Sequence, residues 1–272
     1  MGGPPTSRFL YAPSVYLFIG DESNATADEG EFFIYGGLML SDDQAIRIHQ
    51  RMVELRRQHQ LGVDDRVKFT THARPAHVSI DDWRDLKAAV LDALVEVEAV
   101  FMAYYVHHRI ADPQGIPTRN RWAVEAILYR FQLFLREVDD FGFATFDNIE
   151  EADLRRYDLA RINTEGLTFD GATVALDRIV GLARSHVEWT HLLSATDVAL
   201  GAFAYTTNHP ERDATVNMMR RVSRLFWGHQ AAEGIRYIGE RGLIRRPQAI
   251  RAPDIAARYT WLEQHVERLL NV

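Results

Sequence analysis

The feature that most constrains the fold of this chain is the segment from Thr118 to Val138, which is apolar on nearly every side. Aromatic and aliphatic side chains recur through it at helical spacing, among them Trp122, Ile127 and Phe134. A helix with one apolar stripe packs on one neighbour, whereas a helix this apolar is sandwiched, commonly against a sheet. The sequence therefore predicts that this helix lies on a β-sheet.

Apolar, β-prone runs supply the strands of that sheet. The predicted strands cover residues 14–20, 32–40, 97–107 and 141–148, with a short edge strand near Ser185 to Trp189. The first two are separated by an acidic loop, which indicates an antiparallel hairpin with a long connection. Helices are predicted from capping-box patterns at Ser41 and Ser79, running to about residues 60 and 96. Strands followed by helix, strand and helix are typical of an α/β fold with a mixed sheet.

Composition excludes several classes of protein. Cysteine is absent, which rules out disulfides, thiolate zinc sites and thiol nucleophiles. No apolar stretch approaches the ~20 residues that span a bilayer, and the N-terminus lacks a signal-peptide pattern, so we expect a cytoplasmic protein with no membrane partner.

The net charge of −7 argues against non-specific coating of nucleic acid. The charge is uneven, because eleven Arg and seven acids from Glu211 onward give +4 and leave −11 for the rest. The cluster of Arg220, Arg221 and Arg224 could contact phosphates. The simpler interpretation is a solvated helical face with ion pairs.

Three aspartates stand at the edges of predicted buried elements. Asp21 and Asp147 each end a strand, and Asp197 interrupts an apolar helix. Each has a local explanation, since Asp21 can be a turn residue, Asp147 can open a loop, and Asp197 can form a capping box with Ser194. Acids at strand ends of an open α/β sheet can also converge. Converging carboxylates repel one another unless cations bind, and Mg²⁺ or Mn²⁺ suits such oxygen ligands.

The order of short motifs resembles one known family. "YLFIGDES", "FFIYGGLML", "VKFT", "FDN" and "SATDVALGAF" are similar to the successive motifs of the DUF3800 family, whose fold is expected to be ribonuclease H-like. The resemblance covers about residues 14–208. The chain departs from the family pattern at Asn24, where the family has Gly, at Arg66, where it has an acid, and at Ser194, where it has Gln.

The resemblance implies an α/β fold with a ribonuclease H-like mixed sheet flanked by helices and a C-terminal helical extension. Residues 1–13 would form a flexible tail, 14–210 the core, and 211–272 a helical, Arg-rich extension packed on it. The implied metal ligands are Asp21, Asp147 and Asp197, with Glu22 as a fourth ligand or a supporting acid. Lys68 would reach the scissile phosphate or neutralise the acids, a role that suits its compact charge.

These observations predict a Mg²⁺- or Mn²⁺-dependent nuclease that hydrolyses DNA or RNA at a two-metal carboxylate site, in phage defence or mobile-element biology. The alternative is a non-catalytic nucleic-acid-binding or scaffolding subunit, with a protein partner or as a homo-oligomer. His107 and His108 are adjacent in a strand and point to opposite faces, so they do not readily share one metal ion.

Overall fold

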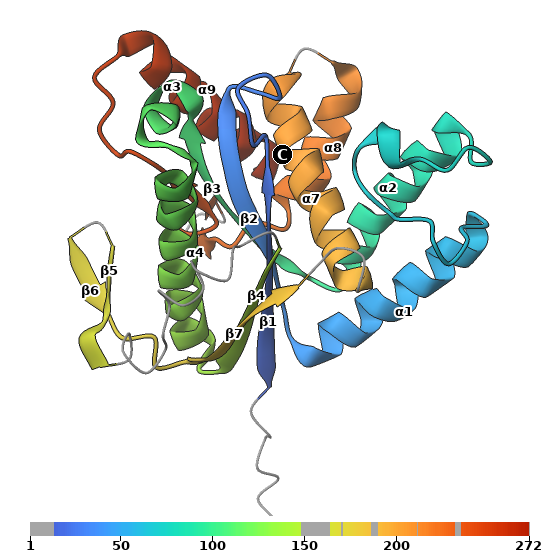
Figure 1. Cartoon of the computed structure of the whole chain (residues 1–272), viewed down its shortest axis with the longest axis horizontal. Helices are drawn as coiled ribbons and strands as arrows, with labels where there is room; N and C mark the ends of the chain where they lie inside the picture. Colours follow the sequence, from blue (N-terminus) through green and yellow to red (C-terminus); the bar gives the residue numbers. More distant parts are fainter. Residues whose placement is uncertain are drawn as a thin grey trace, which may run out of the picture.

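The computed structural model describes residues 14–147, 164–169, 171–185, 190–210, 212–231 and 235–271. Its centre is a six-stranded mixed sheet with the strand order β10-β3-β2-β1-β4-β7 (Figure 1). The strands are β1 (Val15–Ser23), β2 (Phe32–Leu40), β3 (Val100–His107), β4 (Phe141–Asp147), β7 (Ile179–Ser185) and β10 (Leu243–Arg245). β1, β2 and β3 pair antiparallel, while β4 lies parallel to β1, β7 parallel to β4, and β10 parallel to β3.

Helices cover both faces of the sheet (Figure 1). The long helix α4 (Ile116–Val138) packs on one face, and its Tyr129 ring also contacts Phe169 of a small hairpin at a centroid distance of 5.5 Å. The opposite face carries α1 (Asp42–Gln58), α2 (Ile80–Glu96), α7 (His191–Asn208), α8 (Asp213–Ser223) and α9 (Pro253–Leu270). The remaining short elements are η1 (Thr71–Ala73), α3 (His108–Ala111), η2 (Asp112–Gln114), β5 (Leu167–Phe169), β6 (Ala172–Val174), β8 (His229–Gln230) and β9 (Arg236–Tyr237).

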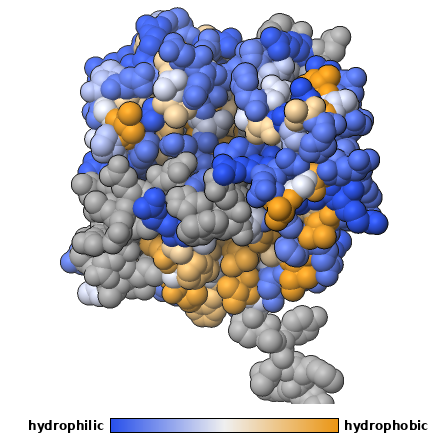
Figure 2. Space-filling view, turned by 45° about the vertical axis from the view of Figure 1, so that its right-hand side comes forward, coloured by the Kyte–Doolittle hydropathy of each residue, from blue (hydrophilic) through white to orange (hydrophobic). Residues whose placement is uncertain are grey.

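The sheet separates two hydrophobic cores because side chains alternate along each strand. On β1, Phe18 belongs to the core under α4, and Ile19 to the core under α7 and its neighbours. The helix α4 is buried against the sheet by residues such as Ile127 and Phe131. The surface in Figure 2 is mainly hydrophilic in its upper half, and its larger hydrophobic areas lie lower down.

The predicted fold class is confirmed: the chain is an α/β protein with a six-stranded mixed sheet, flanking helices and a C-terminal helix. The predicted cap at Ser41 is present as a full capping box, and the Ser79 side chain accepts from the N–H of Asp82. Among the described residues, no helix is long and apolar enough to cross a membrane.

Some boundaries differ from the prediction. β1 runs on to Ser23 because β2 continues to pair with it beyond Gly20, so Asp21 does not end the strand. Strand β7 covers Ile179–Ser185, and only Ser185 of the predicted edge strand falls in the described part, because residues 186–189 lie outside it, as do 1–13 and 148–163. The segment after residue 210 contributes β10 to the sheet as well as helices, because Leu243–Arg245 pair with β3.

Gly36 allows β2 and β3 to approach each other closely. A Cβ atom built there would lie 2.4 Å from the carbonyl oxygen of Met102 and 2.9 Å from the Cα of Ala103. Both are backbone atoms of the neighbouring strand, so the sheet would have to move to accept a side chain. On β1, the residue opposite Gly36 is Asp21, which places this close packing beside the candidate site.

We therefore expect Gly36→Ala to lower the free energy of unfolding by about 1–3 kcal/mol, the usual range for overpacking a filled interior. Urea denaturation measures the change. Gly239→Ala is the matched control, because a Cβ there meets nothing within 4 Å. Equal stability of the two variants would contradict this account of the strand packing.

Candidate active site

Asp21 and Asp147 follow directly on the last paired residues of two parallel strands. β1 and β4 stay in register up to Gly20 opposite Phe146. Phe146 packs in the core under α4, so the alternation of the strand directs Asp147 to the opposite face. Asp21 shares that face with Ile19, which packs under α7. Both carboxylates are buried, with exposed fractions of 8% for Asp21 and 5% for Asp147.

Asp197 reaches the same face from helix α7. The helix begins at His191 after an N-cap at Thr190, so Asp197 lies in its second turn. The interpretation of Ser194 and Asp197 as a capping box is therefore wrong. The Oδ2 atom of Asp197 instead accepts a hydrogen bond of 2.6 Å from the backbone N–H of Phe69.

The three carboxylates lie close enough to repel one another. Burial raises the pKa of Asp21 to about 7, and repulsion by Asp197 and Asp147 adds to this effect. The N–H of Glu22 opposes it by donating to Asp21 Oδ1 at 2.8 Å. Burial likewise raises the pKa of Asp197, again with a contribution from Asp147. Such mutual repulsion favours binding of a proton or a metal cation at this position.

Both lysines of the chain act on this cluster. The charge of Lys68 lowers the pKa of Asp197 against the effect of burial, and Lys87 makes a smaller contribution in the same direction. Lys87 comes from α2 and is itself buried, with an exposed fraction of 6%. Burial lowers the pKa of Lys87.

The backbone of Phe69 connects the lysines to the aspartates. Its N–H donates to Asp197, and its carbonyl oxygen accepts from Lys87 Nζ at 3.0 Å. The Lys87 ammonium also lies 4.5 Å from the centroid of the Phe69 ring. The Phe69 residue is thus held on both sides, and this fixes the position of the adjacent Lys68.

Glu22 lies beside the aspartates but is directed toward the face of α4 by the alternation of β1. Burial raises its pKa and repulsion by Asp147 adds to this, whereas the charge of Arg119 lowers it. Arg119 belongs to α4, is buried, and stacks with its guanidinium carbon 3.9 Å from the centroid of the Phe33 ring. Glu22 is therefore a neighbour of the aspartate cluster whose main cationic partner is Arg119.

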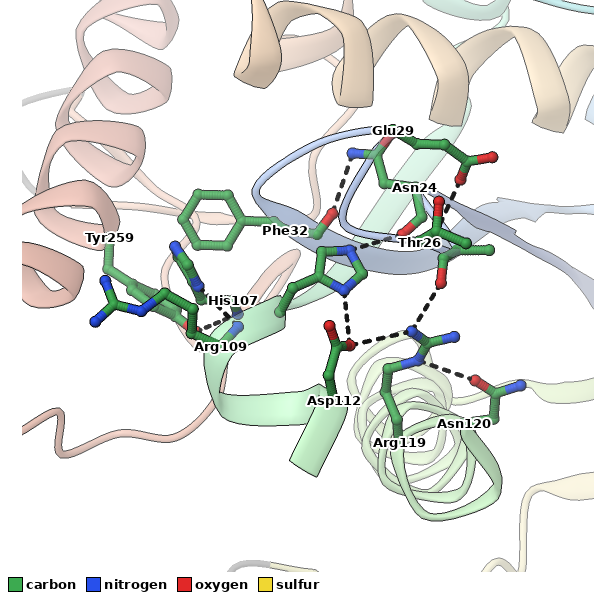
Figure 3. A network of polar contacts seen from close by, with 12 residues as sticks. Asn24, Thr26, Glu29, Phe32, His107, Arg109, Asp112, Arg119, Asn120 and Tyr259 are labelled. Carbon is green, nitrogen blue, oxygen red and sulfur yellow. Dashed lines mark hydrogen bonds and ion pairs between the residues drawn. The ribbon is translucent and has the colours of Figure 1, made fainter. Parts of the chain in front are cut away.

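A polar network holds the loop that follows β1 (Figure 3). Arg119 Nη1 donates to the carbonyl oxygen of Ala25 at 2.8 Å and lies 3.8 Å from the carboxylate of Asp112. Both ring nitrogens of His108 face oxygen acceptors, Asn24 O at 3.0 Å and Asp112 Oδ1 at 2.9 Å. His108 is therefore a buried structural residue that anchors the start of this loop.

Electrostatic interactions connect Asp21, Asp147, Asp197 and Lys68 in the structure, with Glu22 alongside, and their roles as metal ligands and catalytic residues stay predictions. Within the described ranges, no group of three or more His, Cys, Asp or Glu side chains is already arranged to hold a metal ion. Sequence reasoning missed the role of Lys87. A signal was present, because Lys87 falls within the buried stripe of its helix, next to Leu86 and one turn before Leu91.

The C-terminal arginines are partly used in ion pairs. Arg221 Nε lies 2.5 Å from Asp92, Arg241 Nη1 2.6 Å from Glu137, and Arg258 Nε 2.7 Å from Glu31. Arg220 and Arg224 are exposed and form no ion pair in the part of the chain that the structure describes. The arginine cluster is therefore partly an ion-paired face and partly a source of available cations.

A cleft with a volume of about 860 Å³ opens next to the aspartates. The aspartates do not line it, but their neighbours Ser23, Phe69 and Gly201 do. From there its walls are formed by α2, by the second half of α7 and by α8. The volume lies within the range of about 300–1,000 Å³ that is typical of ligand-binding clefts.

Comparison with known proteins adds nothing to this description. No protein-family model matches the chain, and no curated protein or solved structure shows detectable similarity to it. The resemblance to the DUF3800 family therefore stays a prediction that depends on the motifs in the sequence.

The raised pKa of Asp21 predicts a pH-dependent stability. The pKa of Asp21 is 3.8 in the unfolded chain and about 7 in the folded protein. The folded protein therefore holds this proton more tightly, so its contribution to stability is fully present below pH 3.8 and is lost as the pH rises to about 7. The loss is of the order of 4 kcal/mol for a shift of this size. Asp21→Asn carries no charge at any pH, so we expect the variant to be more stable than the original chain at pH 8 and similar to it at pH 4.

Urea denaturation of both proteins at pH 4 and pH 8 measures this difference. Asp28→Asn removes an exposed acid from the following loop and is the control. If Asp21→Asn and the original chain have the same free energy of unfolding at both pH values, this account of the buried cluster is wrong.

Proposed function

We propose that this protein is a Mg²⁺- or Mn²⁺-dependent nuclease that hydrolyses phosphodiester bonds at the aspartate cluster. The observation that carries the proposal is the convergence of Asp21, Asp147 and Asp197, which come from two strands and a helix. Each is far from the others in sequence, two are buried, and their mutual repulsion contributes to the raised pKa of Asp21. A fold that served structure alone would gain nothing from assembling like charges in this way.

The donor set fits a hard divalent cation. The candidate ligands are carboxylate oxygens, without sulfur or imidazole, and such ligands suit Mg²⁺ and Mn²⁺ better than zinc or copper. Two carboxylate oxygens already accept backbone hydrogen bonds, Asp21 Oδ1 from Glu22 and Asp197 Oδ2 from Phe69. The proposal therefore rests on the chemistry and charge of these donors and not on a preformed coordination shell.

The roles of the residues follow from their positions. Divalent ions at such a site supply charge stabilisation for the attacking and leaving oxygens of a phosphodiester. The three aspartates would hold the ions, and the hydrogen bond from Phe69 orients the Asp197 carboxylate. Lys68, held in place by the Phe69 backbone, would bind a non-bridging phosphate oxygen as a compact point charge. Glu22 would remain paired electrostatically with Arg119 and support the strand end.

The proposal includes a cytoplasmic setting, a DNA or RNA substrate, and a role in phage defence or mobile-element biology. The alternative function, a non-catalytic subunit that binds nucleic acid or a protein partner, uses the same fold without cleavage. The two candidate functions differ in the role of the aspartates, which a nuclease needs for turnover and a non-catalytic subunit does not.

Purified protein should cleave DNA or RNA when Mg²⁺ or Mn²⁺ is added and not in EDTA. Asp21→Asn and Asp197→Asn should each reduce cleavage to background, because each removes a charged ligand while preserving shape. Isothermal calorimetry with Mn²⁺ alone should show the same loss of binding, which provides a readout independent of substrate. The control is Asp28→Asn, and cleavage that persists in both cluster variants would reject the nuclease assignment.

Lys68 provides a second test. Lys68→Met removes the charge that opposes the effect of burial on the pKa of Asp197, so we expect the acid limb of the pH–rate profile to move to higher pH. Lys68→Arg should leave that limb close to its original position, because it retains the charge. Activity should still fall in the Arg variant if the compact ammonium binds the phosphate. An unchanged profile in Lys68→Met would contradict the assigned role.

A further inference from the structure

The cleft beside the aspartates continues along one stripe of helix α7. Asp197, Gly201, Tyr205 and Asn208 lie on the same face of the helix, since residues three and four apart are neighbours on a helix surface. The last three of these line the cleft. A ligand with one end at the aspartates would therefore extend along α7, where residues of α2 and α8 also line the cleft.

Two aromatic side chains form the wall nearest the aspartates. The rings of Phe69 and Tyr205 are 5.8 Å apart between centroids, and both line the cleft. Phe69 can pack on α7 because residue 201 is glycine: a Cβ there would lie 2.4 Å from the Phe69 Cβ. The hydroxyl of Tyr205 accepts a hydrogen bond of 2.6 Å from Arg212 Nη1, which restrains the ring.

The cleft adjoins a cationic hollow. A second hollow of about 430 Å³ shares Asn217 and Arg221 with the cleft and adds Arg220 and Arg224. Its one acidic residue, Asp92, is paired with Arg221. Two acids also line the larger cleft: Glu29, whose carbonyl oxygen accepts a hydrogen bond from Asn208, and Asp85, which follows Arg84 on α2. The cleft thus has an aromatic wall beside the aspartates and connects with an arginine group.

We propose that this path binds an unpaired strand of nucleic acid, with bases on Phe69 and Tyr205 and phosphates at Arg220 and Arg224. Aromatic walls bind bases through their flat faces, and these faces are accessible in a single strand but stacked inside a duplex. The arginines supply the sequence-independent contact to the backbone. The inference rests on the proposed function in placing the scissile phosphate at the aspartates.

Binding is tested without cleavage. Fluorescence anisotropy in EDTA compares a labelled oligothymidylate with a blunt duplex of the same length, and the single strand should bind more tightly. Tyr205→Leu should weaken single-strand binding about tenfold, within the range for loss of one base-stacking contact. Tyr205→Phe keeps the ring and should bind like the original chain. Tyr237→Leu, which removes an exposed aromatic residue outside the cleft, is the control.

The arginine group is tested through salt dependence. The double variant Arg220→Gln, Arg224→Gln should flatten the slope of log affinity against log salt by about 1.4, since each phosphate contact on a single strand contributes about 0.7. The double variant Arg47→Gln, Arg51→Gln makes the same change in net charge on α1. It should leave the slope as it is.

A photo-cross-linking experiment on the unaltered chain covers the case in which a variant fails to fold. A strand carrying 5-iododeoxyuridine should give adducts at Phe69 or Tyr205. The proposal would be overturned if the duplex binds as tightly as the single strand or if Tyr205→Leu binds the single strand with unchanged affinity. It would also be overturned if the adducts lie only outside the cleft. These binding measurements are made without metal and are independent of the cleavage assay with Mg²⁺ or Mn²⁺. A protein that binds the single strand but does not cleave in that assay would reject the nuclease function and leave the strand-binding proposal supported.

Discussion

The constraint on which the rest of the structure depends is the convergence of three carboxylates, two of them buried, around the junction of β1, β4 and α7. Burial and mutual repulsion together raise the pKa of Asp21 to about 7. Nearby groups offset this only in part, through the backbone amides of Glu22 and Phe69 and the charges of Lys68 and Lys87. The sheet order, with β1 between an antiparallel and a parallel neighbour, is what brings the two strand aspartates side by side.

Much of the fold could be predicted because it depends on local patterns. The apolar helix ending at Val138, the cap at Ser41 and the β-prone runs each carry their signal within a short window. The end of β1 could not be placed in this way, because its last residues, including Asp21, are strand through pairing with β2. The same holds for β10, which is too short to be recognised alone and exists through its pairing with β3.

The sequence indicated the acids of the candidate site, but it did not indicate the groups that contact them. Asp147 and Asp197 are unusual for their apolar surroundings, which is a sequence signal. The hydrogen bond from Phe69 to Asp197 joins residues 128 positions apart and leaves no trace in either local pattern. Phe69 also links the two proposals, because its backbone positions the aspartate cluster and its side chain forms the cleft wall. Whatever binds in the cleft therefore contacts the residue that orients Asp197.

The parallel pairing of β10 with β3 has a consequence for the order in which this protein can be completed during translation. Until Leu243–Arg245 have been synthesised, β3 presents an unpaired hydrogen-bonding edge, and Tyr259 has yet to accept from the N–H of His107. A ribosome-bound intermediate would display this apolar edge for more than a hundred residues of elongation. Open edges of that kind can pair with other chains, so the late synthesis of β10 leaves the nascent polypeptide exposed to such pairing.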